Sequence, residues 1–175
     1  MLTGKEIFNA GFIKGALEQN VQQQGVDVRV SKISKVFGSG IIPVEGKTQR
    51  AQTSELPLFS DDGWRLQPGY YEVEFEEGCE MPNNIGLQFK TRSSLVRCGC
   101  DIRSGHFDPG FKTDHMGAFM EVSLPVTIYK GACLAQVITF ESNSVDNLYD
   151  GQWQDDKQRK TSKTKKNDKT SKQQA

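Results

Sequence analysis

Residues 90–97 read Lys-Thr-Arg-Ser-Ser-Leu-Val-Arg and form the densest group of side chains that could bind an anion. Arg92 and Arg97 flank the hydroxyls of Ser93 and Ser94. Guanidinium groups match phosphate oxygens, and hydroxyls and backbone N–H groups at the start of a helix add further donors. Taken alone, the segment is equally compatible with an ordinary helix N-terminus beside a solvated arginine.

Two other segments place polar side chains next to turn signals. Residues 104–111 read Ser-Gly-His-Phe-Asp-Pro-Gly-Phe, and Asp108 begins their Asp-Pro-Gly turn. Residues 129–136 read Tyr-Lys-Gly-Ala-Cys-Leu-Ala-Gln, which predicts a strand, a turn and a second strand that carries Gln136. Each pattern is also common without a binding site, because such turns are ordinary and a single Gln on a strand usually has a structural partner.

Glu121 is the side chain best suited to acid–base chemistry. It lies between Met120 and Val122 in an apolar stretch. One carboxylate can act first as a base and then as an acid when its surroundings adjust its affinity for protons. Without further context, Glu121 would be the solvent-facing residue of a half-buried strand.

The histidines and cysteines argue against a zinc deaminase. That site needs His-x-Glu followed by Pro-Cys-x-x-Cys. His106 is followed by Phe and Asp, and the cysteines, at positions 79, 98, 100 and 133, contain no Cys-x-x-Cys. We interpret the cysteines as reduced, mostly core residues of a cytoplasmic protein.

Alternating apolar and polar residues predict the strands that must position these groups. The predicted strands cover residues 25–30, 70–75, 85–90, 119–122, 126–129 and 134–140. Many short strands separated by Gly, Pro, Asn and Asp favour an all-β sandwich or barrel. A loose apolar face predicts a helix within residues 3–18, and the polar, Gly-rich residues 38–63 are predicted to be irregular.

Charge divides the chain into a body, residues 1–154, and a tail, residues 155–175. The tail holds eight Lys or Arg against three Asp, although the whole chain has 22 basic and 22 acidic residues. No apolar residue occurs between Lys157 and Ala175, so the tail is predicted to be disordered. Its basic charge could attract nucleic acid, but a solvating tail is the simpler interpretation. The body contains no apolar run long enough to span a membrane and begins without a signal-peptide pattern.

The order and spacing of these segments resembles the dCTP deaminase and dUTPase family. The resemblance covers residues 1–154 and rests on the opening residues 1–7, Gly-Val-Asp-Val at 25–28, Leu-Gln-Pro-Gly at 66–69, the segments 92–97, 104–111, 120–121 and 129–136, and the closing residues 149–154. It implies a distorted jelly-roll or β-barrel of the dUTPase-like type with a short N-terminal helix. It also implies a homotrimer whose active sites lie between subunits.

The resemblance assigns roles to individual residues. The implied catalytic residues are Glu121, Arg97, Ser93 and Asp108. The implied substrate-binding residues are Arg92, Ser94, Leu95, Ser104, Gly105, Phe107, Met120, Gln136, Tyr149 and Gln152. Asp108 is expected to face the deoxyribose, and Tyr149 and Gln152 are expected to close over the phosphates. Mg²⁺ is expected to accompany the triphosphate rather than bind a dedicated protein site.

Two reactions are compatible with this set of residues. We expect deamination of dCTP to dUTP by Glu121, which could continue to dUMP. The alternative is hydrolysis of dUTP to dUMP and pyrophosphate, in which Asp108 orients water and Glu121 is not needed. Lys112 to Gly117 form an insertion similar to that of some archaeal-type dUTPases, Ser104 replaces the usual Ala, and Cys133 replaces a frequent Arg. A nucleotide-sensing homologue without turnover is the remaining alternative.

Overall fold

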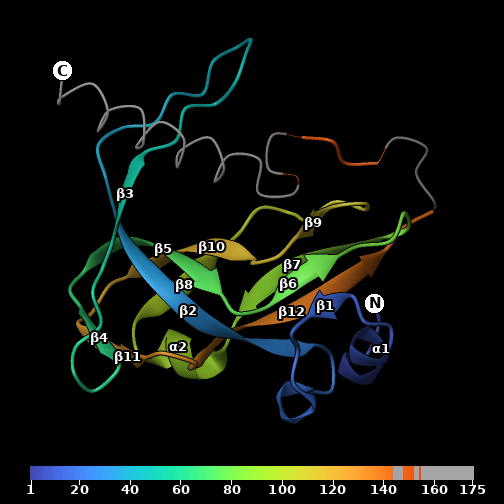
Figure 1. The fold of residues 1–175 in the computed structure, drawn as a ribbon, viewed down its shortest axis with the longest axis horizontal. Helices are drawn as coiled ribbons and strands as arrows, with labels where there is room; N and C mark the ends of the chain where they lie inside the picture. The colour runs from blue at the N-terminus through green and yellow to red at the C-terminus, as the bar shows by residue number, and fades with distance from the viewer. Residues whose placement is uncertain (144–147, 152–153, 155–175) are drawn as a thin grey trace, which may run out of the picture.

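A computed structural model describes residues 1–143, 148–151 and 154 (Figure 1). The predicted lid residue Gln152 and the predicted tail, residues 155–175, lie outside the described residues. None of the described helices is long and apolar enough to cross a membrane.

Short strands make up most of the described chain. The helices are α1 (Gly4–Asn9), the 3-10 helix η1 (Glu18–Asn20) and α2 (Ser93–Arg97). The strands are β1 (Ile13–Lys14), β2 (Val26–Phe37), β3 (Gln52–Glu55), β4 (Gly63–Leu66), β5 (Gly69–Phe75), β6 (Gly78–Glu80), β7 (Ile85–Thr91), β8 (Cys100–Arg103), β9 (Lys112–Thr113), β10 (Gly117–Val122), β11 (Val126–Tyr129) and β12 (Cys133–Glu141).

The largest sheet follows the order β7-β12-β2-β5-β10-β8, and β3 pairs with β2 beside it. Smaller sheets are formed by β1-β6-β9 and by β11-β4. The outer strands β7 and β8 approach each other, because Thr91 Oγ1 accepts a hydrogen bond from Ile102 N at 2.9 Å and donates one to Asp101 Oδ1 at 2.5 Å. This contact nearly closes the sheet into a barrel (Figure 1).

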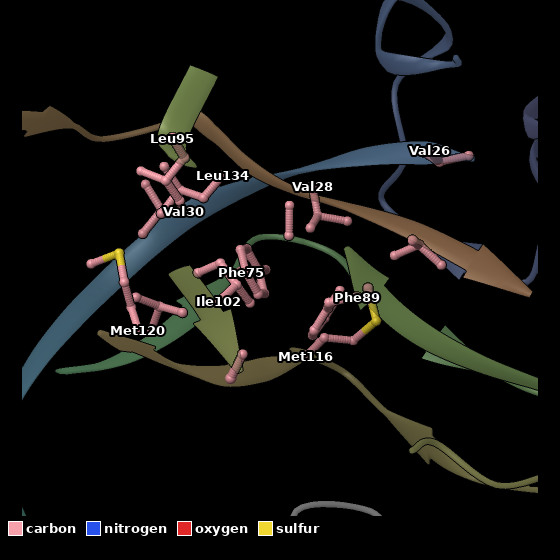
Figure 2. Packing of buried hydrophobic residues seen from close by; sticks show 14 of the residues in the cluster. Val26, Val28, Val30, Phe75, Phe89, Leu95, Ile102, Met116, Met120 and Leu134 are labelled. Carbon is pink, nitrogen blue, oxygen red and sulfur yellow. The ribbon is translucent and has the colours of Figure 1, made fainter. Parts of the chain in front are cut away.

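The core fills the inside of this barrel with alternate residues of its strands. Val26, Val28 and Val30 of β2 are fully buried, as expected from the two-residue period of a strand (Figure 2). A chain of aromatic contacts leads outward from the core. The ring of Phe75 lies 4.9 Å from that of Phe89, which lies 5.3 Å from that of Phe107.

The structure confirms the barrel-like all-β fold and every strand predicted from the alternating pattern. The helix predicted within residues 3–18 is too long, since α1 ends at Asn9. Gly11 adopts a φ of 70°, and Ile13 and Lys14 then pair with β6. The prediction that residues 38–63 are irregular is also wrong in part, because they contain β3 and the paired residues Ile41 and Gln49.

Candidate functional site

A cavity of about 300 Å³ opens beside the end of β8. Residues 104–108 line it as the chain leaves β8, together with Phe111 and Tyr149. Phe107 pairs with Leu87 of β7 through two backbone hydrogen bonds of 2.9 Å, which hold this loop against the sheet. The ring of Phe111 lies 5.2 Å from that of Phe107 and 5.3 Å from that of Tyr149. The cavity therefore has an aromatic wall that continues from the core.

The Asp-Pro-Gly turn presents Asp108 at this cavity. Asp108 O accepts a hydrogen bond from Phe111 N at 3.1 Å, and Gly110 completes the turn with a φ of 81°. Tyr149 N donates to Pro109 O at 3.2 Å, which joins the chain near the C-terminal end to the turn. Asp108 is exposed and lines the cavity, so its carboxylate can reach a ligand.

Ser104 adds a hydroxyl group to the same wall. Its Oγ is buried and has no hydrogen-bond partner among the described residues. Because this atom has almost no accessible surface, the substrate-binding role expected of Ser104 stays a prediction.

Three neighbouring strands complete the cavity with a row of outward-facing side chains. Phe119 of β10 lies opposite Glu72 of β5 and Arg103 of β8. All three line the cavity, and Arg103 forms an ion pair with Glu121. Glu121 itself does not line the cavity, and its carboxylate contacts the guanidinium group of Arg103. The predicted catalytic glutamate is therefore adjacent to the cavity and held by a cavity residue.

The side chain of Met120 lies on the opposite face of β10 from Phe119 and Glu121. It is fully buried in the core and does not line the cavity, so the substrate contact predicted for Met120 stays a prediction (Figure 2). The strand alternation explains the difference, because Phe119 and Glu121 share the opposite face of the strand.

A second polar cluster surrounds Asp27 of β2. The side chain of Asp27 is only 3% exposed and pairs with Arg92 Nε at 3.2 Å. Gln22 Nε2 donates to Asp27 Oδ2 at 3.2 Å, and Gln136 Nε2 donates to Asp27 Oδ1 at 3.4 Å. Arg92 also donates to Cys133 O at 3.4 Å. Asp27 thus joins the predicted residues Arg92 and Gln136, which the sequence pattern did not connect.

The short helix α2 begins directly after Arg92. Leu95 is buried and anchors the helix, whereas Ser93, Ser94 and Arg97 are exposed. These residues do not line the cavity of Asp108. Within one chain, the predicted site residues therefore lie on two separate surfaces, one around α2 and one around the cavity.

The burial of Asp27 has a consequence for the pH dependence of stability. Burial raises the pKa of the Asp27 carboxyl above its usual range, and the ion pair with Arg92 opposes this only in part. The stabilisation by the retained proton is complete below about pH 4, the ordinary pKa of aspartate, and is lost as the pH rises through the raised pKa. We expect Asp27→Asn to gain thermal stability relative to the wild type as the pH rises from about 4 to 7.

Thermal unfolding of both proteins across this range measures the effect. Asp61→Asn is a matched control with the opposite sign, because the hydrogen bonds from Arg65 lower the pKa of Asp61. A melting-temperature difference between wild type and Asp27→Asn that stays constant with pH would contradict the assignment.

Sequence reasoning missed two arginines of the cavity, Arg50 and Arg103. Arg50 lies in the segment predicted to be irregular, and Arg103 ends β8, a strand that the alternating pattern did not identify. The one available signal was the position of Arg103 directly before the loop that carries Asp108.

Comparison with known proteins identifies the family of the chain. A family model described as dCTP deaminase-like matches residues 5–142. A deoxyuridine 5'-triphosphate nucleotidohydrolase of Methanocaldococcus jannaschii is 33% identical over 143 residues, which cover 80% of this chain and 90% of that protein. A probable deoxyuridine 5'-triphosphate nucleotidohydrolase of Halobacterium salinarum is 30% identical over 152 residues, covering 84% of this chain and 90% of that protein.

A solved structure has a similar fold. The 2'-deoxycytidine 5'-triphosphate deaminase of Agrobacterium tumefaciens aligns with a TM-score of 0.57 and 17% sequence identity. The alignment covers 79% of this chain and 46% of that one, so this chain spans about half the length of the deaminase. The matched family model and the archaeal relatives show that the chain belongs to the dCTP deaminase-like family.

Proposed function

We propose that this protein hydrolyses dUTP to dUMP and pyrophosphate. The observation that carries the proposal is that only one of the two candidate carboxylates lines the cavity. Asp108 lines the cavity, whereas Glu121 contacts Arg103 and does not line it. Hydrolysis uses the first carboxylate and does not require the second. The dUTP nucleotidohydrolases of Methanocaldococcus jannaschii and Halobacterium salinarum support the same reaction.

In this reaction Asp108 orients a water molecule and accepts its proton. The water oxygen forms a bond to the α-phosphorus, and the bond from the α-phosphorus to the bridging oxygen breaks. Pyrophosphate leaves with the bond electrons, and dUMP remains. The aromatic wall of Phe107, Phe111 and Tyr149 offers an apolar surface for the nucleoside.

The residues are compatible with Mg²⁺ that is carried by the nucleotide. Within the described chain no three His, Cys, Asp or Glu side chains gather into a metal site. Mg²⁺ commonly keeps several waters and binds through the substrate phosphates. Glu72 of the cavity is paired with Arg50, which leaves the phosphates as the main ligands of the ion. When bound, the ion would offset the negative charge of the phosphates.

We further propose that two copies of the chain build each site, as in a homotrimer. The exposed residues of α2, Ser93, Ser94 and Arg97, suit a triphosphate but do not line the cavity of the same chain. A neighbouring subunit that presents its α2 at the cavity would bring the two sets of residues together.

The state of the cysteines supports a reducing compartment, which we infer to be the cytoplasm. Cys79 and Cys100 are buried and Cys98 is exposed, and none of the four cysteines, which all lie in the described part of the chain, forms a disulfide. Proteins of oxidising compartments usually form disulfides from such residues.

Deamination of dCTP is the second candidate, favoured by one observation. The side chain of Glu121 is 29% exposed and contacts Arg103, which lines the cavity, so a movement of Arg103 could release the carboxylate. Turnover of dCTP would then depend on Glu121.

A product assay with purified protein and Mg²⁺ separates the two reactions. dUTP and dCTP are offered separately to the wild type and to Glu121→Gln, and the products are separated by ion-exchange chromatography. We expect dUMP and pyrophosphate from dUTP, with a rate that Glu121→Gln changes by less than about tenfold, because the glutamate takes no proton in hydrolysis. Formation of dUTP or dUMP from dCTP, abolished in Glu121→Gln, would instead establish the deaminase.

A further inference from the structure

The segment between β2 and β3 leaves the sheet and returns to it at β3 (Figure 1). Ile41 and Gln49 pair through two backbone hydrogen bonds of 2.9 Å, which bring the two arms of the segment together. Arg50 follows directly and lines the cavity. A part of the chain without a recognisable motif thus contributes a cation to the candidate site.

Glu72 holds the guanidinium group of Arg50 at this position. Arg50 Nη2 donates to Glu72 Oε1, and the two side chains are 32% and 23% exposed. Glu72 lies on β5 in the middle of the sheet, directly opposite Phe119 of β10. The guanidinium group of Arg50 is therefore held by a strand in the middle of the sheet, although Arg50 itself belongs to a long connecting segment.

The cations of the cavity flank an aromatic side chain. Phe119 is 39% exposed and lies between Arg103 on β8 and Glu72 on β5. Glu72 in turn forms the ion pair with Arg50. The other aromatic residues of the cavity form the wall between Phe107 and Tyr149. The cavity thus combines an apolar part, which suits a base and a sugar, with guanidinium groups, which suit an anion.

The ion pair between Arg50 and Glu72 is unlike one that is needed for the stability of the fold. A partly exposed ion pair usually contributes little to the stability of a fold. A guanidinium group has five N–H donors in a planar arrangement, so it can contact a carboxylate and a phosphate at the same time. From these observations we propose that Arg50 binds phosphate oxygens of the nucleotide and that Glu72 is its positioning residue. This inference rests on the proposed function and adds a specific phosphate contact to it.

The test compares ligands that share a nucleoside but differ in phosphate. Isothermal titration calorimetry measures binding of Mg²⁺ with α,β-imido-dUTP, which is not hydrolysed, and of deoxyuridine. The proteins are the full-length wild type, Arg50→Ala, Arg50→Lys, Glu72→Gln and the control Arg65→Ala. Arg65 forms a similar ion pair with Asp61 and does not line the cavity.

We expect Arg50→Ala to raise the Kd of α,β-imido-dUTP about ten- to a hundredfold, since a charged hydrogen bond is lost. Deoxyuridine binding should stay within about twofold of the wild type, because the nucleoside lacks the phosphates that Arg50 contacts. Arg50→Lys should recover part of the affinity, Glu72→Gln should lose less than Arg50→Ala, and Arg65→Ala should bind both ligands like the wild type. Steady-state kinetics should give a raised KM for dUTP with a smaller change in kcat.

Each other outcome overturns a distinct statement. Equal loss of both ligands, together with a lower melting temperature, would make Arg50 a structural residue. Unchanged affinity of Arg50→Ala for α,β-imido-dUTP would exclude the phosphate contact while leaving the proposed function intact. Failure of the wild type itself to bind α,β-imido-dUTP would overturn the proposed function and this inference with it.

Discussion

Asp108→Asn is expected to lower kcat for dUTP hydrolysis by about a hundredfold to ten-thousandfold, the usual contribution of a general base. Asparagine has nearly the same shape as aspartate, so the turn formed with Phe111 and Gly110 should persist. The amide cannot accept the proton of the attacking water. Binding of α,β-imido-dUTP should therefore remain measurable when turnover is lost.

Steady-state kinetics of dUTP consumption, with binding measured in parallel, checks this expectation. Asp101→Asn is a suitable control, because Asp101 lies on the exposed face of β8 and contacts Thr91 instead of the cavity. A kcat of Asp108→Asn within about threefold of the wild type would remove Asp108 from the chemistry, since it would fall well short of the contribution of a general base.

Arg29→Met is expected to cause the largest loss of stability, about 3–5 kcal/mol in the free energy of unfolding. Glu77 is fully buried, and its Oε1 accepts from Arg29 Nε at 2.6 Å while its Oε2 accepts from Arg29 N at 2.8 Å. Methionine keeps most of the side-chain volume but leaves the carboxylate buried without its cation. A buried charge that has lost its partner is far more costly than an exposed one.

Urea unfolding followed by circular dichroism measures this effect. Arg65→Met removes an exposed, solvent-screened ion pair with Asp61 and should therefore cost far less stability than Arg29→Met. The double variant Arg29→Met with Glu77→Gln should regain part of the loss, because it buries no net charge. Equal effects of Arg29→Met and Arg65→Met would contradict the importance of burial.

The sequence predicts the regular part of the fold well for a physical reason. Strands such as β5 and β7 alternate because one face packs in the core, and this period is visible in the residues alone. Strands β1 and β9 have only two residues each and form through pairing with β6, so they leave no period to detect. The helix predicted within residues 3–18 is too long for a similar reason, because the pairing of residues 13–14 with β6 outweighs their weak apolar helical face.

The candidate site was predictable only where its residues follow one another along the chain. The segments around Arg92 and Asp108 carry recognisable patterns, whereas the contacts of Arg92 with Asp27 and of Arg50 with Glu72 join distant segments. Register across strands decides these contacts, and no short motif records it. The alternation of side chains along β10, in contrast, explains why Phe119, and not Met120, lines the cavity.

The pairing of β2 with β12 has a consequence for how the protein is made. β2 lies in the first part of the described chain and β12 near its end, yet they are neighbours in the middle of the largest sheet. During synthesis, β2 leaves the ribosome long before its partner exists, so the barrel cannot close until almost all of the body has been translated. Contacts between segments this distant form slowly, which exposes the unpaired strand edges to other chains in the meantime. The nascent protein is therefore most prone to aggregation just before the last strand emerges.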